Sequence, residues 1–385
     1  MKKIKKIFKI AIIPIFLLAI LSVITNKLIK KDFDSLNKMD QNMLNQLSQV
    51  YEIYNNKSKD IWKEGYTFND IPLVLTPVNK DRGIIHSYSY VIGVNKLENS
   101  ILAKKIKIPE EMNLPPVYRV VSIHPSLYQT WLPINFSFTD IGDKHAMLFK
   151  YNPNSANASD EEKSYKYFLM HEAFHEYRQV PLWKNINDLQ SVIFIEERNE
   201  EQYQLLLTEI AILDKARNTN NKDELLDILS DFVTVRDIRY NKFEYMKQEK
   251  KVETLEGCAQ YIEYRYSKSV GESVFPLFDT SEETTKLTDI FNMESLEILI
   301  DKKYLNGFMD KDLYYYIGAL EGIFLDKLQI SWKDRVENNE LIYDIIKSEI
   351  EEKTSHNRKN IEDIKKEYGY NNFSTQSKII VENLK

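Results

Sequence analysis

The chain has 385 residues but a single cysteine, Cys258. One cysteine forms no disulfide within the chain and cannot build a cysteine-rich zinc module, so we expect any metal to be held by His, Asp or Glu. We interpret Cys258 as a small buried apolar residue rather than a thiolate ligand. Excess basic charge is also lacking, because 58 Asp and Glu outnumber 52 Lys and Arg. A nucleic-acid binder normally carries a basic face, so this class of function is disfavoured.

The N-terminus has the pattern of an export signal. Lysines between Lys2 and Lys9 precede an apolar run over residues 10–25. This run is short for a membrane span and long for a signal-peptide core. Because no small-x-small cleavage site follows it, we expect an uncleaved anchor in the cytoplasmic membrane, with the folded domain outside the cytoplasm. A cleaved signal would instead give a secreted protein.

The order of the sequence patterns predicts an α+β fold with a small N-terminal sheet and a mainly helical part after it. Short β-branched or aromatic segments predict strands at residues 71–75, 86–94, 117–123 and 145–151, whereas almost everything beyond residue 159 is typical of helix. We therefore divide the chain into a signal anchor (1–31), a helical stalk or first helix (32–66), a main domain (67–350, sheet-rich over 67–155 and helical over 156–350) and a polar tail (351–385).

One helix of this main domain is predicted over residues 160–179. Ser159 or Asp160 is the expected N-cap, acidic residues fill the first turn, and Pro181 is expected to end the helix. This segment contains the sequence His-Glu-Ala-Phe-His from His171 to His175.

The spacing of that motif suits a catalytic zinc ion. Residues four apart share one helix face, so His171 and His175 can both reach one Zn²⁺. Glu172 is rotated about 100° from His171, beside the metal, where it can serve as general base and then general acid. The alternative is an amphipathic surface helix that carries these residues without a metal.

A catalytic zinc needs a third protein ligand, and no histidine lies a short distance downstream. His356 lies in the polar tail, and we assign His86, His124 and His145 to packing or surface roles. Carboxylates therefore remain as candidates. We expect the charge run of Glu196, Glu197, Glu200 and Glu201 to be a solvated surface. Glu209 lies in an apolar helix, where Arg236 or Arg239 could be its ion-pair partner. The third group is Glu253, Glu256 and Glu263, where the small residue Gly257 would allow close approach of another helix.

The motif order resembles the gluzincin metallopeptidases, in particular the aminopeptidase N group. His-Glu-x-x-His is followed by Glu-Gly-x-Ala-x-Tyr, beginning at Glu256, and by Tyr-x-x-Gly, beginning at Tyr315. The resemblance implies a zincin-like fold, Glu256 as third zinc ligand and Tyr315 as the donor that stabilises the oxyanion. The chain departs from the group in two ways. It has a long gap after His175, where we expect an inserted helical pair over about 185–217 and 223–250. It also lacks the Gly-x-Met-Glu-Asn element that grips a free amino terminus.

The sequence thus predicts zinc-dependent hydrolysis of peptide bonds at the outer side of the cytoplasmic membrane. The substrate would be a peptide or protein, bound in extended form along an edge strand. Without the amino-terminus element, exopeptidase and endopeptidase action both stay open. The alternative function is a catalytically inactive, membrane-tethered binding or sensory protein on a metallopeptidase scaffold, against which the intact base Glu172 argues. A structural protein without metal is the third hypothesis.

Overall fold

A computed structural model describes residues 17, 20–28, 31–156, 164–184, 186–195, 197–278, 285–354 and 359–384. The basic stretch, most of the apolar run, Ser159, Asp160, Glu196 and His356 lie outside the described residues. Within the described part of the chain, no helix is long and apolar enough to cross a membrane. The contacts divide the chain into two compact units, Met1–Ala173 and Phe174–Lys385.

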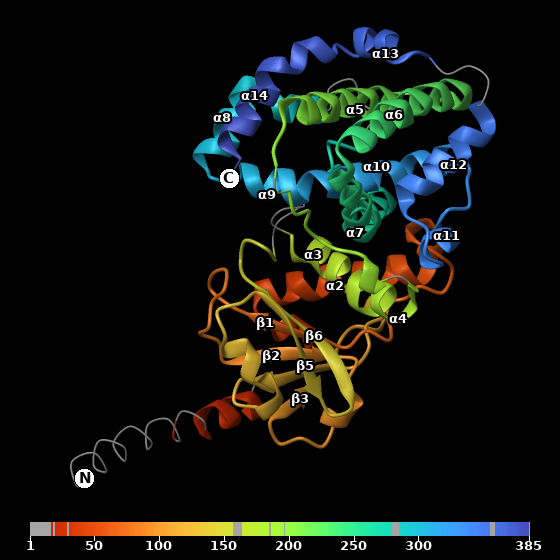
Figure 1. Cartoon of the computed structure of the whole chain (residues 1–385). Coiled ribbons are helices and arrows are strands. Elements are labelled where there is room, and N and C mark those ends of the chain that lie inside the picture. Colours follow the sequence, from red (N-terminus) through yellow and green to blue (C-terminus); the bar gives the residue numbers. More distant parts are fainter. Residues whose placement is uncertain are drawn as a thin grey trace. The chain divides into compact units, whose positions relative to one another are not determined.

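The first unit contains a six-stranded sheet with the strand order β3-β4-β2-β1-β6-β5 (Figure 1). Its strands are β1 (Leu73–Pro77), β2 (Tyr88–Ile92), β3 (Ala103–Lys105), β4 (Val117–Val121), β5 (Phe136–Ile141) and β6 (Lys144–Tyr151). Only β1 and β6 are parallel, and the other neighbouring pairs are antiparallel. The four predicted strands are present with shifted ends, as β1, β2, β4 and β6. The two strands that the sequence did not indicate, β3 and β5, form the edges of the sheet.

The first helix of this unit, α2 (Lys38–Ile61), is tied to the sheet by one carboxylate. Asp40 is buried and accepts hydrogen bonds from the hydroxyl groups of Tyr88 (2.6 Å), Tyr90 (2.8 Å) and Tyr151 (2.7 Å). The first two tyrosines lie on β2 and the third on β6. Of the two alternatives for residues 32–66, the first helix of a folded domain fits these contacts, whereas a free stalk does not.

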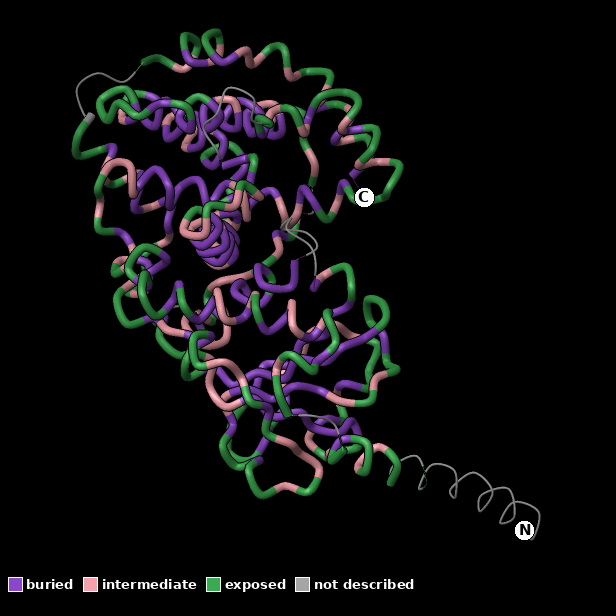
Figure 2. Tube along the Cα trace, turned by 180° about the vertical axis from the view of Figure 1, so that it is seen from behind, coloured by how far each residue is buried: buried purple, intermediate pink, exposed green. Residues whose placement is uncertain are grey.

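The second unit is helical. Its helices are α4 (Val180–Leu182), α5 (Glu200–Asn218), α6 (Lys222–Lys242), α7 (Glu249–Val270), α8 (Met293–Asp301), α9 (Leu305–Gly307), α10 (Leu313–Lys327), α11 (Lys333–Glu337), α12 (Ile342–Thr354), α13 (Ile361–Glu367) and α14 (Ser374–Asn383). Buried residues dominate α5, α7 and α10 (Figure 2). Together with the sheet of the first unit, this confirms the α+β class, while the zincin-like assignment stays a prediction.

Two predicted segments of this unit differ in detail from the structure. The inserted helical pair is present as α5 and α6, but α5 begins only at Glu200, capped by the side chain of Asn199. The described residues before it contain one short 3₁₀ turn, Ile186–Asp188, and contact Asp310. Ile193 donates its backbone N–H to the backbone carbonyl of Asp310, and Arg198 forms an ion pair with the Asp310 side chain. The predicted polar tail includes α13 and α14, and α14 packs on α5.

Helices α7 and α10 cross at two glycines. A Cβ atom on Gly257 would lie 2.5 Å from the Cα atom of Gly318, and a Cβ atom on Gly318 would collide with the backbone carbonyl of Glu253. Only glycine fits at either position, so the two backbones are in direct contact. This crossing confirms that the small residue after Glu256 allows another helix to approach closely.

We predict that Gly318→Ala lowers the free energy of unfolding by about 3 kcal/mol, because the added methyl group must push two helix backbones apart. The measurement is urea denaturation followed by far-UV circular dichroism. Gly307→Ala is the matched control, since a Cβ atom there meets nothing closer than 3.6 Å, in the ring of Tyr304. Equal denaturation midpoints for the two variants would contradict the close crossing.

Candidate metal centre

The motif helix continues through a wider turn before it ends. It begins as α3 (Tyr165–Phe174), becomes π-helical over His175–Gln179 and returns to α-helix as α4. The prediction that Pro181 ends the helix at residue 179 is therefore wrong, because the helix runs to Leu182. Proline lacks an N–H and its ring excludes the carbonyl group four residues earlier. The π-helical turn lies directly before Pro181 and lets the helix continue past the proline. Such turns are frequent at functional sites.

Two of the predicted ligands meet at this turn. The Nε2 atom of His175 lies 3.1 Å from the Oε2 atom of Glu256, which comes from α7. Glu256 is buried, and His175 is half-buried. Two donor atoms that each bind a tetrahedral Zn²⁺ at 2.0–2.1 Å stand roughly 3.3 Å apart, so this separation fits a shared ion.

His171 completes a group of three. It lies one helical turn before His175 and is buried. One ligand atom from each of His171, His175 and Glu256 lies within 4.8 Å of the others. Among the described residues, no other group of three His, Cys, Asp or Glu side chains meets that condition. Two imidazoles and one carboxylate are a donor set that catalytic zinc accepts, with the fourth position left for water.

The other candidate ligands named from the sequence are bound to other residues, exposed or packed in the core. Glu209 is fully buried, as expected for an apolar helix, and accepts hydrogen bonds from Arg236 (2.9 Å) and Arg239 (2.6 Å). Both arginines named from the sequence are thus its partners, and Glu209 is not part of the histidine group. Glu197 and Glu200 are exposed. Cys258 is fully buried, and burial raises the pKa of its thiol well above the ordinary value, which agrees with a packing role.

Of the two residues predicted to be catalytic, Glu172 is next to a predicted ligand in the chain, and Tyr315 lies on the helix that crosses α7. Glu172 follows His171 directly and is half-buried. Tyr315 is half-buried on α10, one turn before Gly318, while Glu256 directly precedes Gly257. Because the two glycines are in contact, Tyr315 and Glu256 both lie within about one helical turn of the same crossing point.

Two residues near this group were not found from the sequence. Asp312 ends a second π-helical turn, Phe308–Asp312, directly before α10. Burial, with the charge of Glu256, raises the pKa of Asp312 to about 6, so this carboxyl group lies within electrostatic reach of the proposed ligand. Gln179 is the other residue: it is fully buried and contacts His175. The four-residue spacing from His175 to Gln179 is a local signal that the sequence analysis did not use. Asp312 has no comparable signal, because its neighbour Glu256 lies far away in sequence.

The donor group invites comparison with known zinc enzymes. The chain matches no family model, no curated protein and no solved structure. A relationship to zinc peptidases therefore remains an interpretation of the motif order and of the donor set.

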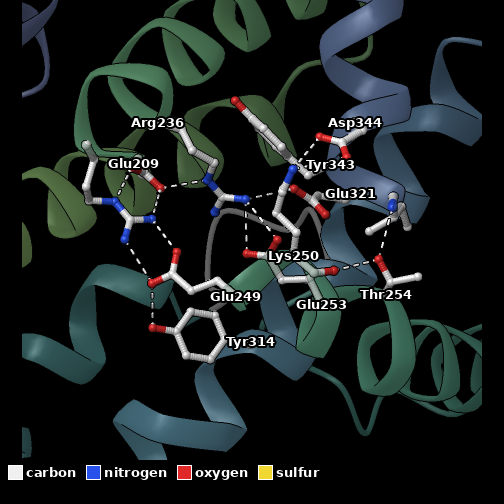
Figure 3. A network of polar contacts seen from close by, with 12 residues as sticks. Glu209, Arg236, Glu249, Lys250, Glu253, Thr254, Tyr314, Glu321, Tyr343 and Asp344 are labelled. Atoms are coloured by element: carbon white, nitrogen blue, oxygen red, sulfur yellow. Dashed lines mark hydrogen bonds and ion pairs between the residues drawn. The ribbon is translucent and has the colours of Figure 1, made fainter. Parts of the chain in front are cut away.

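A buried ion network connects α5, α6, α7 and α10, and it shares α7 with the proposed ligand Glu256 (Figure 3). Arg236 bonds Glu209, Glu253 and Glu321, whereas Arg239 bonds Glu209 and Glu249. All six side chains are fully buried, and four carboxyl groups therefore share two guanidinium groups. Tyr314 donates a further hydrogen bond to Glu249.

Because the network has more carboxyl groups than guanidinium groups, some of its carboxyl groups are favoured in the protonated form. Burial raises the pKa of Glu253 to about 7 and holds that of Glu321 well above its usual range, against an ordinary value of 4.5. A buried carboxyl group without a full share of positive charge is more stable when it is protonated. Glu253 lies one turn before Glu256 on α7, so the network also supports the backbone that carries the proposed ligand.

We predict that the helical unit loses stability as the pH rises. Because the folded-state pKa of Glu253 is raised, its contribution is fully present below pH 4.5 and is lost as the pH rises through about 7. Urea denaturation at a series of pH values between about 5 and 8 measures this decline. In Glu321→Gln, which removes one ionisable group of the network, the decline should be shallower. The exposed-site control Glu362→Gln should follow the wild type, and identical pH profiles for all three proteins would contradict the prediction.

Proposed function

We propose that this protein is a zinc-dependent metallopeptidase of gluzincin-like type. The observation that carries the proposal is the convergence of His171, His175 and Glu256, which also stand in the motif order expected from the sequence. The exclusion of Glu209 supports it further, because its two oxygens are occupied by arginines. A carboxylate as the third ligand distinguishes this type of site from one with three histidines.

The residues of the chain divide the chemistry among them. His171, His175 and Glu256 would hold the ion, which when bound supplies a Lewis acid and makes a water molecule acidic enough to attack at neutral pH. Glu172 accepts the proton of the attacking water and then donates it to the nitrogen of the leaving amine. The phenol of Tyr315 donates a hydrogen bond to the oxygen that becomes negative in the tetrahedral intermediate.

The substrate in this proposal is a peptide or protein outside the cytoplasm. The placement rests on the N-terminal basic and apolar sequence alone. The absence of a Gly-x-Met-Glu-Asn element removes the usual grip on a free amino terminus, so we favour neither end-cleavage nor internal cleavage. An extended peptide commonly binds along the edge strand of a sheet, and β3 and β5 are the edge strands of this sheet.

The proposal predicts that Glu172→Gln lowers the rate of peptide hydrolysis by roughly 10²–10⁴-fold, which is the usual contribution of a positioned general base. The assay uses the full-length protein with a library of fluorogenic peptides, before and after chelation and after zinc is restored. Glu197→Gln serves as the control, because it removes an exposed carboxylate from the charge run. Zinc content is measured for every sample.

Each outcome has a distinct meaning. Full hydrolysis by Glu172→Gln would disprove this mechanism. Zinc-loaded wild-type protein that cleaves no member of the library would favour the inactive binding or sensory protein. A wild-type protein that holds no zinc after careful preparation would favour a structural role.

A further inference from the structure

The side chain of Gln179 joins His175 to the helix that carries Glu256. Gln179 is the last residue of the π-helical turn and is fully buried. One end of its amide lies 2.5 Å from the Nδ1 atom of His175, and the other end lies 2.8 Å from the backbone carbonyl oxygen of Leu255. Leu255 directly precedes Glu256 on α7.

The carbonyl of Leu255 decides which way this amide is turned. A backbone carbonyl can only accept a hydrogen bond, so the atom of Gln179 that faces it must be the NH₂ nitrogen. The atom that faces His175 is then the Oε1 oxygen, which can only accept. The Nδ1 atom of His175 must therefore carry a hydrogen and donate it.

This assignment directs the other ring nitrogen. With Nδ1 committed to Gln179, Nε2 is the nitrogen left for a ligand, and it is the one that lies 3.1 Å from the Oε2 atom of Glu256. At that distance Nε2 either donates a hydrogen to Glu256, when the ring is doubly protonated, or shares a cation with the carboxylate oxygen. In both cases Gln179 turns Nε2 toward Glu256, and this is the orientation in which the two atoms could share a cation.

We propose that Gln179 is a positioning residue, which holds the ring of His175 with Nδ1 protonated and Nε2 turned toward Glu256, and which fixes the spacing between these two ligands through Leu255. Its purpose rests on the proposed function, but the contacts themselves do not. A partner on the second nitrogen of a ligand histidine fixes the tautomer and the ring orientation, and its loss typically weakens metal binding 10–100-fold.

A neutral amide suits this position better than a carboxylate. It donates to the carbonyl of Leu255 and accepts from His175 at the same time, and a carboxylate could do only the second. Glutamine also adds no charge to a place that already holds Glu256 and, within its electrostatic reach, Asp312. Gln179 thus makes two contacts, one with His175 and one with Leu255, and two substitutions can distinguish their effects.

The test compares Gln179→Glu, which keeps an acceptor for His175, with Gln179→Met, which has a similar length but keeps neither hydrogen bond. Both lose the donor to Leu255, so we expect both to lower the free energy of unfolding. Gln179→Asn, one methylene shorter, gives a second removal of the contact if the methionine variant does not fold. Full-length protein with ¹⁵N-labelled histidine is used, and the His175 signals are assigned by their loss in His175→Gln.

The first readout is the hydrogen on Nδ1 of His175 in metal-free protein, observed by ¹⁵N–¹H NMR. We expect a protected Nδ1–H signal in the wild type and in Gln179→Glu, and none in Gln179→Met or Gln179→Asn. The second readout is zinc affinity, measured by competition with a chromophoric chelator. Gln179→Met and Gln179→Asn should bind zinc 10–100-fold more weakly than the wild type, and Gln179→Glu should lose less.

The outcomes separate this proposal from the function on which it rests. If Gln179→Met and Gln179→Glu are equally destabilised and lose zinc affinity equally, Gln179 only stabilises the fold and the proposal is overturned. A wild-type Nδ1 without hydrogen would also overturn it. If the wild type binds no zinc but shows an Nδ1–H signal that Gln179→Met lacks, the proposed function fails while the positioning role stands.

Discussion

The backbone contact between α7 and α10 is the constraint on which the helical unit depends. Two glycines, Gly257 and Gly318, leave no room for a side chain between these helices. Glu256 directly precedes the first glycine, and Tyr315 lies one turn before the second. Glu256 and Tyr315, the two residues indicated by the family motifs, thus lie beside the glycines that the close helix packing requires. The glycine after the candidate ligand therefore has a packing role, which is to let α10 approach α7 closely.

The close crossing also brings charged side chains of the two helices together. Glu253 on α7 and Glu321 on α10 lie near each other because the helices touch, and both accept hydrogen bonds from the Nη1 atom of Arg236. Such a network is costly to bury, and removing one partner of a buried ion pair leaves an uncompensated charge. It ties α7 to α6 through Glu249 and Glu253, and Glu256 on the same helix contacts His175. Gln179 provides the second connection, from the motif helix to the carbonyl of Leu255.

The sequence predicted the parts of the site that depend on local spacing. His171 and His175 share a helix face by periodicity alone, and the Glu-Gly pattern indicated Glu256. It could not choose between Glu256 and Glu209 on physical grounds, because each is an acid in a helix with apolar neighbours, and only the positions of Arg236 and Arg239 separate them. Asp312 was missed because its effect arises from Glu256, which lies far away in sequence. Gln179 lies four residues after His175, so helix periodicity could have indicated their contact, but its second contact, with Leu255, is long-range. The edge strand β3 was missed because it has only three residues, two of them lysines. The edge strand β5 begins with the alternation Phe-Ser-Phe-Thr, which is a strand pattern that the sequence analysis overlooked.

The central claim is that His171, His175 and Glu256 bind one zinc ion, and zinc-edge X-ray absorption with metal analysis tests it most directly. The account predicts one zinc per chain, with only nitrogen and oxygen neighbours at about 2.0–2.2 Å and no sulfur. It also predicts that Glu256→Ala greatly weakens zinc binding, whereas Glu209→Gln destabilises the fold but keeps the same absorption spectrum. A sulfur neighbour, or zinc that is lost in Glu209→Gln and retained in Glu256→Ala, would contradict it.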